Sequence, residues 1–513
     1  MGLTPVNALS KSGHIYSLSL PSPFPCFVGG FLTSSYMAEP KKQDLPEERF
    51  PIPESLSGLF QKKELNDKHL WLVGTLTRHI TRQDEEAVDY DPHSYKPLYS
   101  RILKGILTSN YSTALKLLKD KGLVEAELNS KGDETYDNGR GVSKKYRLTD
   151  ALRKEVLKDQ LTTLSIQKQT LLKQIERSLL AAQERVFEEY SWAREELTAL
   201  DYLRWNEEGA RVWLREVERS GQLNGERVTN KQLINLEDNI HSITKLFGND
   251  KLIARVSVKH GRLFHILTYC KKELRQFVTN CEGQPLKEID MRSAQWLLLA
   301  YCMALATKHG YTADLKQQLL KHVGEPLDVL NTLYSSAQAF ASAIIFQDLY
   351  KELAALAKGN FYDNRHLKKV TDDERDRIKK LLLKCVLYGY QTAQMKKAFT
   401  DIPQSDKSFL EVFYETYDDV ILFCKSIAED CKNRKSNGQI SRSGCLSELL
   451  STMEGDFFHN KLRKALKSHF LDTVGYFIVH DGIYVDPVAT DSTHDIMKRL
   501  AKEQFGAGDL FSL

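Results

Sequence analysis

The segment YFIVHDGIYVD, residues 476–486, decides how the C-terminal half of the chain is interpreted. β-Branched and aromatic residues alternate on both sides of His-Asp-Gly, which is the pattern of two strands joined by a short turn. Asp-Gly is preferred in two-residue hairpin turns because Gly adopts positive φ at little cost. The sequence therefore predicts a β-hairpin. Asp481 is either a simple turn residue or, where a second carboxylate lies on another strand, part of a metal site.

The composition is that of an ordinary globular protein. Of 513 residues, 42% are hydrophobic and 27% are charged, with a net charge of +4. This length exceeds what one compact core accommodates, so we expect several domains. No apolar run approaches the roughly 18–20 residues that a membrane span requires, and the eight cysteines show no zinc-ligand spacing. We expect a cytoplasmic protein with reduced thiols and no membrane partner, and the weak positive charge neither demands nor excludes nucleic acid.

The first 45 residues differ from the rest of the chain. Lys11 is the only Lys, Arg, Asp or Glu among residues 1–36, and several prolines interrupt the apolar stretches. A signal peptide would need a basic start and an unbroken apolar region. We therefore predict a disordered leader over residues 1–45, with a true start at Met37 as the alternative.

Residues 46–150 contain the pattern of a small DNA-binding domain. Two amphipathic helical segments flank a turn near Asn110, and GLVEAEL and KKYRL follow as strands around a glycine-rich loop. This order resembles a winged helix. Winged helices place the second helix in a DNA groove and the wing on the backbone, and they also serve as protein-interaction modules. The DNA contacts that the resemblance implies are Tyr111, Ser112, Lys116, Lys119, Arg140, Lys144 and Lys145.

Helical spacing dominates residues 151–255. Leucine and isoleucine residues from Leu157 to Leu180 recur with this spacing over a stretch longer than an ordinary globular helix. We predict a long helical hairpin here, either a coiled-coil spacer or an arm projecting from a larger body.

A second carboxylate is predicted at a strand end. PLKEID, residues 285–290, follows a Gly-Gln-Pro turn as a strand, and SAQWLLLAYCMALA, residues 293–306, follows as a helix. Asp290 is therefore expected at the end of a strand, where the backbone holds a carboxylate rigidly. This residue is the candidate partner of Asp481.

Four segments in order carry a resemblance to the palm and fingers of family A DNA polymerases and, more distantly, to phage-type single-subunit RNA polymerases. They are GRL at 261–263, EIDMRSAQ at 288–295, RDRIKKLLLKCVLYG at 375–389 and VHDG at 479–482. Single motifs of this kind are weak, and their order adds specificity. The resemblance covers roughly residues 256–513 and implies a right-hand polymerase in which residues 151–255 are thumb-like.

The resemblance implies a site for nucleotidyl transfer by two Mg²⁺ ions, which Asp290 and Asp481 would hold. Lys380 would neutralise the pyrophosphate, with Arg377 as its companion and Tyr388 beside the nucleotide. The partners would be a primer-template and nucleoside triphosphates. Two further residues, Arg262 and His480, would contact the primer-template and its terminus.

The chain departs from the family pattern at three positions. Gln295 replaces a glutamate that excludes the 2′-hydroxyl, Lys384 replaces an aromatic residue of the fingers helix, and Gly482 replaces an acidic residue. The first departure leaves selection between deoxyribonucleotides and ribonucleotides open. No carboxylate cluster for a proofreading exonuclease is evident.

We therefore predict a helix-rich α+β fold: winged helix (46–150), thumb-like hairpin (151–255), first palm part (256–310), fingers (311–400) and second palm part (401–513). The predicted function is DNA-dependent DNA synthesis in replication, as in a phage or mobile element, with possible replication partners. RNA synthesis by the same site is the first alternative. A non-catalytic DNA-binding replication protein is the second, and a coiled-coil scaffold the third.

Overall fold

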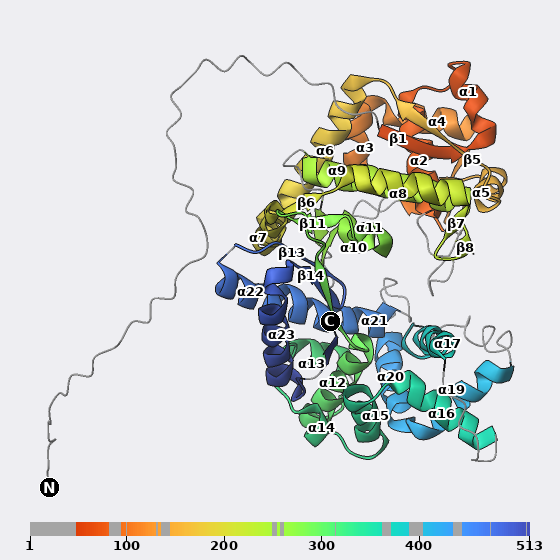
Figure 1. Ribbon diagram of the computed structural model, residues 1–513. Helices are drawn as coiled ribbons and strands as arrows, with labels where there is room; N and C mark the ends of the chain where they lie inside the picture. Colours follow the sequence, from red (N-terminus) through yellow and green to blue (C-terminus); the bar gives the residue numbers. More distant parts are fainter. Residues whose placement is uncertain are drawn as a thin grey trace, which may run out of the picture. The chain divides into compact units, whose positions relative to one another are not determined.

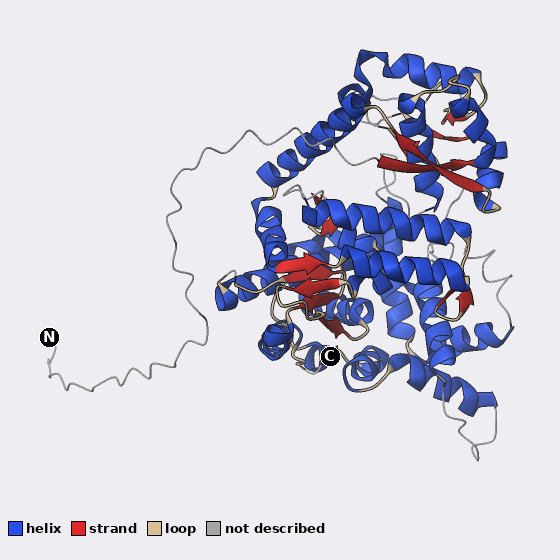
Figure 2. Cartoon of the chain, turned by 45° about the horizontal axis from the view of Figure 1, so that its top comes forward, coloured by secondary structure: helices blue, strands red, loops and turns tan. Residues whose placement is uncertain are grey.

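The computed structural model describes residues 48–81, 94–98, 100–129, 132–134, 144–248, 254–256, 261–312, 314–361, 371–388, 404–433, 444–471, 473–508 and 510–512. Helices make up most of this part of the chain, and the strands form small antiparallel sheets (Figures 1 and 2). The predicted helix-rich α+β class is confirmed. The predicted leader, residues 1–45, lies outside the described residues. Within the described ranges, no helix combines the length and apolar character needed to cross a bilayer.

The N-terminal elements follow the predicted order of helix, helix, strand and strand. Leu103, Ile106, Ala114, Leu115 and Leu118 bury the faces that their spacing predicted. A short strand before the two helices joins the sheet in the order β2-β4-β3. The elements are α2 (Asp67–Thr81), β2 (Lys96–Pro97), α3 (Ser100–Leu107), α4 (Tyr111–Asp120), β3 (Val124–Ala126) and β4 (Lys145–Leu148).

The predicted continuous helical spacing from Leu157 to Leu180 is wrong in its first part. Helix α5 (Asp150–Leu157) ends there, and β5 (Leu161–Ile166) pairs along its whole length with β1 (Glu48–Pro53) before α6 (Gln169–Glu189) begins. Thr162 and Thr163 favour extended backbone because they are β-branched, and Asp159 has a φ of 63°, which interrupts the helix. Pairing with a strand distant in sequence has overridden the leucine spacing.

A helical hairpin is present later in the same region. Helices α8 (Glu207–Ser220) and α9 (Asn230–Gly248) pack together, joined through the short strands β7 (Gln222–Leu223) and β8 (Glu226–Arg227) (Figure 1). Together with α7 (Ser191–Thr198) they enclose a hydrophobic cluster that includes Leu197, Leu236 and Ile240. The neighbouring elements are β6 (Leu203–Trp205), β9 (Ala254–Val256), β10 (Leu263–His265), α10 (Ile266–Tyr269), α11 (Lys272–Arg275) and β11 (Val278–Asn280).

A four-stranded antiparallel sheet joins this cluster to the main core. Its order is β13-β14-β12-β15, with bounds Tyr476–Val479, Gly482–Val485, Lys287–Met291 and Phe511–Ser512. Side chains alternate between the faces with period two. Ile289, Ile478 and Ile483 enter the main core, whereas Phe477 and Tyr484 join the helical-hairpin cluster. Asp290 directly follows Ile289 on β12, so its side chain lies on the opposite, second face of the sheet. It pairs with Gly482, just as Ile289 pairs with Ile483.

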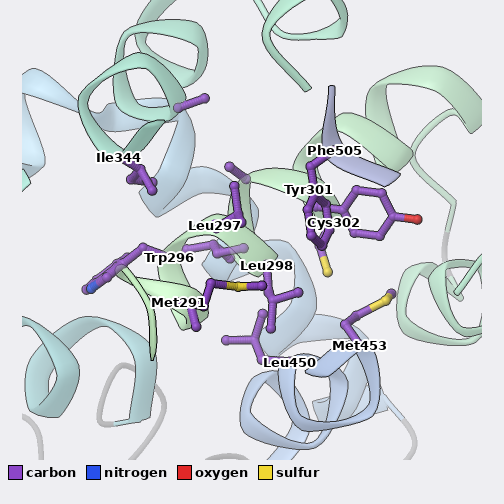
Figure 3. Packing of buried hydrophobic residues seen from close by; sticks show 14 of the residues in the cluster. Met291, Trp296, Leu297, Leu298, Tyr301, Cys302, Ile344, Leu450, Met453 and Phe505 are labelled. Atoms are coloured by element: carbon purple, nitrogen blue, oxygen red, sulfur yellow. The ribbon is translucent and has the colours of Figure 1, made fainter. Parts of the chain in front are cut away.

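Helix α12 (Ala294–His309) is the centre of the main core. Every residue from Trp296 to Ala306 is buried, and Figure 3 shows Trp296, Leu297, Leu298 and Tyr301 among side chains from other helices. The helices of this part are α13 (Leu315–Lys321), α14 (Val329–Thr332), α15 (Ser335–Phe346), α16 (Leu349–Phe361), α17 (Asp372–Leu382), α19 (Gln404–Thr416), α20 (Asp418–Asn433), α21 (Gly444–Gly455), α22 (Arg463–Phe470) and α23 (Thr490–Phe505). Two π-helical segments, Leu383–Tyr388 and Asp456–Leu462, continue α17 and α21.

Candidate active site

One predicted carboxylate lies on a strand, and the other lies in the turn before the strand that pairs with it. Asp290 is the fourth residue of β12, and Asp481 lies in the turn between β13 and β14. The backbone N–H of Met291 donates to the carbonyl of Asp481 at 2.9 Å, which fixes the end of β12 against the turn. Residues almost two hundred positions apart in sequence are thus brought together by the pairing of β12 with β14.

The predicted position of positive φ in the hairpin is wrong. Val479 pairs with Gly482, so the two turn residues are His480 and Asp481, and the positive φ of 49° belongs to His480. Gly482 has no positive φ. It is small because its α-carbon faces Asp290: a Cβ there would lie 3.2 Å from Asp290 Oδ1 and 3.1 Å from the Ile289 carbonyl oxygen. The glycine therefore makes room for a carboxylate.

Backbone strain lies beside both carboxylates. His480 precedes Asp481, and Ser293, three residues after Asp290, has a φ of 51°. A non-glycine residue in the left-handed region costs about 1 kcal/mol or more and persists where the surrounding structure enforces it. Strained residues of this kind cluster at functional sites, so the local geometry is more specific than a simple hairpin requires.

The electrostatics of Asp290 favour a bound cation. Part of the residue is exposed, yet surrounding atoms restrict hydration of its carboxylate, and repulsion from Asp481 and Glu288 adds to this effect. Together they raise the pKa of Asp290 to about 7, although Lys379 and Lys272 act in the opposite direction. Carboxylate oxygens are the ligands that Mg²⁺ prefers. The donor set and its uncompensated repulsion therefore fit a hard divalent cation.

Glu288 lies on the same face of β12 as Asp290 but has other partners. Tyr484 Oη donates to Glu288 Oε1 at 2.7 Å, and Lys272 Nζ forms an ion pair with Glu288 Oε2 at 2.6 Å. The guanidinium of Arg275 lies over the Tyr484 ring, 5.5 Å from its centroid. These contacts hold Glu288 beside the carboxylate pair, where it adds negative charge.

A buried ion pair lies near Asp481. Arg262 Nη2 contacts Glu454 Oε2, and the two side chains are only 11% and 3% exposed. Burial, together with the negative charge of Asp481, raises the pKa of Glu454 to about 7, although Arg262 opposes this shift. Arg262 Nε and Glu454 Oε1 are buried without a hydrogen-bond partner. Buried polar atoms nearly always have partners, so these two atoms indicate a place where water or a ligand completes the structure.

His480 lies in the turn, where the charges of both Arg262 and Asp481 act on it. Its ring lies against Phe264, with centroids 6.4 Å apart, and hydrogen-bonds the backbone of Thr268. Restricted hydration, reinforced by the charge of Arg262, lowers the pKa of His480. The imidazole is therefore held near Asp481 in its neutral form.

The predicted fingers residues lie on helix α17 or directly after it. A capping box at Thr371 and Glu374 starts the helix, and Trp296 Nε1 donates to Tyr350 Oη at 2.8 Å, which ties α12 to α16 beside it. Lys379 is the lysine of this helix whose charge acts on Asp290. The predicted residues are placed as follows: Lys380 is exposed, Arg377 is paired with Asp406, Gln295 lies in the first turn of α12, and Tyr388 ends the π-helical segment.

Three of the seven predicted contacts of the N-terminal domain are lysines paired with carboxylates. Lys119 and Lys144 both pair with Glu134, which lowers the pKa of that carboxylate. Lys145 Nζ pairs with Glu127 Oε2 at 2.9 Å, and Lys116 is exposed on α4. The predicted contact at Arg140 lies outside the described residues.

Three residues near the site were missed by sequence reasoning. Glu288 precedes Asp290 by two positions, so strand alternation places both on one face. Glu454 follows Leu446 and Leu450 at intervals of four and therefore lies on the buried stripe of α21, where a charge signals a special role. Lys379 differs from the predicted Lys380 by one position, which helical rotation alone decides.

The chain is similar to a solved polymerase structure at a low level. The POL domain of Pol1 from M. smegmatis, solved in complex with DNA primer-template and dNTP, has a TM-score of 0.37 and 13% sequence identity. The match covers 58% of this chain and 54% of that one, so the chain spans about half the length of that protein. No protein-family model and no curated protein matches the chain.

Proposed function

We propose that the chain is a metal-dependent, template-directed nucleotidyltransferase, and that it synthesises DNA. The observation that carries this proposal is that Asp290 lies on β12 and Asp481 in the turn that leads into its paired strand β14, with Gly482 leaving room for the Asp290 carboxylate. If Asp481 were only a turn residue, the hairpin would need neither the close approach of Gly482 to Asp290 nor the raised pKa of Asp290. A pair of carboxylates in this arrangement is suited to two metal ions about 3.5–4 Å apart.

Asp290 and Asp481 are the residues that would hold Mg²⁺. When bound, the ions would activate the primer hydroxyl and neutralise the triphosphate and its leaving group. The carboxylates, held by the paired strands, orient the reacting groups without rearrangement at the moment of reaction. Lys379 or Lys380 on α17 would meet the developing negative charge of the pyrophosphate, and the charge of Lys379 already acts on Asp290.

Arg262 and His480 would contact the end of the primer-template, and Glu454 would hold Arg262 in position. The unpartnered Nε of Arg262 is a hydrogen-bond donor, and bases present acceptors in the minor groove. Neutral His480, held by Thr268 and Phe264, would support the primer terminus next to Asp481. In this proposal the nucleic-acid contacts would lie beside the metal ligands.

The N-terminal elements support a winged helix as the accessory domain. The observations that support this assignment are the order α2, β2, α3, α4, β3, β4 and the sheet order β2-β4-β3. We assign it a secondary role in DNA contact because Glu134 and Glu127 neutralise three of its lysines.

The test is extension of a labelled primer-template with Mg²⁺, with dNTPs and NTPs supplied separately. Asp290→Asn and Asp481→Asn should each lower extension at least about a thousandfold, which corresponds to about 4 kcal/mol of transition-state stabilisation. Asp491→Asn is the matched control, because Asp491 is exposed on α23. The productive nucleotide pool identifies the product, since Gln295 leaves sugar selection open.

Two results would overturn the proposal. The first is no extension in either nucleotide pool by folded protein that binds primer-template, which would favour the non-catalytic DNA-binding protein. The second is an equal loss of extension in Asp290→Asn and Asp491→Asn, which would show that general destabilisation rather than lost metal binding causes the effect. Far-UV circular dichroism of each variant provides the folding check.

A further inference from the structure

A second group of convergent ligand atoms lies at the other end of helix α12. His309 is the last residue of α12, His322 follows α13, and Glu325 lies in the next loop. One nitrogen from each imidazole and one carboxylate oxygen all lie within 4.8 Å of one another. Within the described parts of the chain, this is the group of three such residues that could hold a metal ion.

Both imidazoles converge on the same oxygen atom. His309 Nε2 lies 3.0 Å and His322 Nδ1 lies 2.9 Å from Glu325 Oε2. The two rings are stacked nearly parallel, with centroids 3.7 Å apart and an interplanar angle of 13°. The lone pair of an imidazole nitrogen lies in the plane of its ring, so each nitrogen must lose its hydrogen-bonding proton and the two rings must turn out of this stack to bind one ion.

The distances come close to those of a tetrahedral metal site. Bonds of about 2.0–2.1 Å from Zn²⁺ to nitrogen and oxygen place neighbouring ligand atoms about 3.3 Å apart. The separations of 2.9 and 3.0 Å would need to widen by a few tenths of an ångström. All three side chains are between 23% and 31% exposed, so an ion and a water ligand can enter from solvent.

The surroundings orient the three ligands. Lys308 Nζ pairs with Glu325 Oε1, which leaves Oε2 to the histidines and turns it toward them. Tyr301 Oη donates to the Glu325 carbonyl at 2.6 Å, and Gln318 Nε2 donates to the His309 carbonyl at 2.9 Å. Such secondary contacts fix ligand geometry in metal sites. The negative end of the α12 dipole also favours a cation here and offsets part of the repulsion from Lys308.

We propose that His309, His322 and Glu325 bind Zn²⁺ or a related borderline transition-metal ion, with water as the fourth ligand. Two imidazoles and one carboxylate match the preferences of Zn²⁺ and not those of Mg²⁺, which favours oxygen ligands. The site is separate from the carboxylate pair: α12 has 16 residues, which span about 24 Å. The ion would fasten the loop that contains Glu325 to the end of the core helix.

The experiment is a titration of the full chain with Co²⁺ after removal of metal by a chelator, followed by visible absorption. The Asp290→Asn/Asp481→Asn double variant serves as the background, so that the carboxylate pair does not contribute. We expect one equivalent of Co²⁺ to give the intense bands of a four-coordinate ion and Zn²⁺ to displace it. The same equivalent of Zn²⁺ should raise the midpoint of thermal unfolding.

The variants His309→Ala and His322→Ala should each weaken Co²⁺ binding at least about tenfold. His469→Ala is the matched control, because His469 is an exposed histidine at the end of α22. His322→Gln provides a second substitution that retains a polar side chain where the alanine variant does not fold. Absence of a stoichiometric Co²⁺ complex, or a complex that survives in the His309→Ala/His322→Ala variant, would overturn the proposal.

Discussion

The basic side chains of the N-terminal sheet are paired with carboxylates at the protein surface, whereas the charged side chains beside Asp481 are buried and incompletely paired. Glu134 receives both Lys119 and Lys144, and all three remain at least 24% exposed. Arg262 and Glu454 are nearly inaccessible, yet each retains a buried polar atom without a partner. Surface pairs contribute little to stability because water already solvates each charge. Buried charges carry a large desolvation penalty, so the second arrangement persists only where something else favours it.

This contrast indicates that the buried pair, and not the exposed pairs, lies where the chain contacts a ligand. The surface lysines can exchange one partner for another at little energetic cost. The buried pair cannot, because removal of either partner leaves a charge in a medium that solvates it poorly. Proximity to Asp481 and His480 is the reason we assign the buried pair to the end of the nucleic acid.

The largest expected effect comes from breaking the buried pair. Arg262→Met and Glu454→Met should each lower the free energy of unfolding by about 3–5 kcal/mol, because each leaves the other side chain buried without the partner that compensates it. The double variant should lose much less than the sum, since both charges are gone. Urea unfolding of the four proteins gives the coupling energy.

The surface pair supplies the control for this cycle. Lys119→Met, Glu134→Met and their double variant should give a coupling energy below about 1 kcal/mol. Equal coupling energies in the two cycles would contradict the distinction between a buried, functional pair and an exposed, exchangeable one.

A smaller effect is expected from Gly482→Ala. The added Cβ would meet Asp290 Oδ1 at 3.2 Å and the Ile289 carbonyl oxygen at 3.1 Å, so the carboxylate must move. A displacement well below 1 Å in a metal ligand should lower primer extension about 10- to 100-fold, with little change in the midpoint of thermal unfolding. Gly508→Ala is the control, because its Cβ would find its nearest neighbour at an ordinary 3.4 Å. Full activity in Gly482→Ala would show that Asp290 does not need its present position.

The sequence was sufficient to predict the elements that carry the site. Alternation predicted β12, β13 and β14, and a continuous apolar run predicted α12, because these patterns reflect local burial. The same reasoning placed Asp290 at a strand end and Asp481 in a hairpin. It did not give the residue with positive φ, because the register of the hairpin depends on contact with β12 rather than on the Asp-Gly preference.

Contacts distant in sequence explain the other errors. β5 was predicted as helix because its leucines continue the spacing of its neighbours, and only pairing with β1 makes it a strand. Glu454 was not assigned to the site because its partner, Arg262, lies on a different element. Lys379 and Lys380 are both polar residues of α17, and their different directions depend on how that helix packs. Such facts require the tertiary structure.

The smallest expected effect tests the surface lysines as DNA contacts. Glu134→Gln would free Lys119 and Lys144, whereas Glu127→Gln would free Lys145 alone. Each freed lysine that contacts a phosphate releases counterions, so the slope of log K against log salt should steepen by up to about 2 in the first variant and about 1 in the second. Affinity for duplex DNA at low salt should rise a few-fold, measured by fluorescence anisotropy. A graded increase would mean that carboxylates of this domain hold its DNA affinity low, so that the site around Asp290 dominates binding. Identical slopes in the wild type, Glu134→Gln and Glu127→Gln would show that the freed lysines make no phosphate contact. This result would assign the domain to a protein partner instead of DNA.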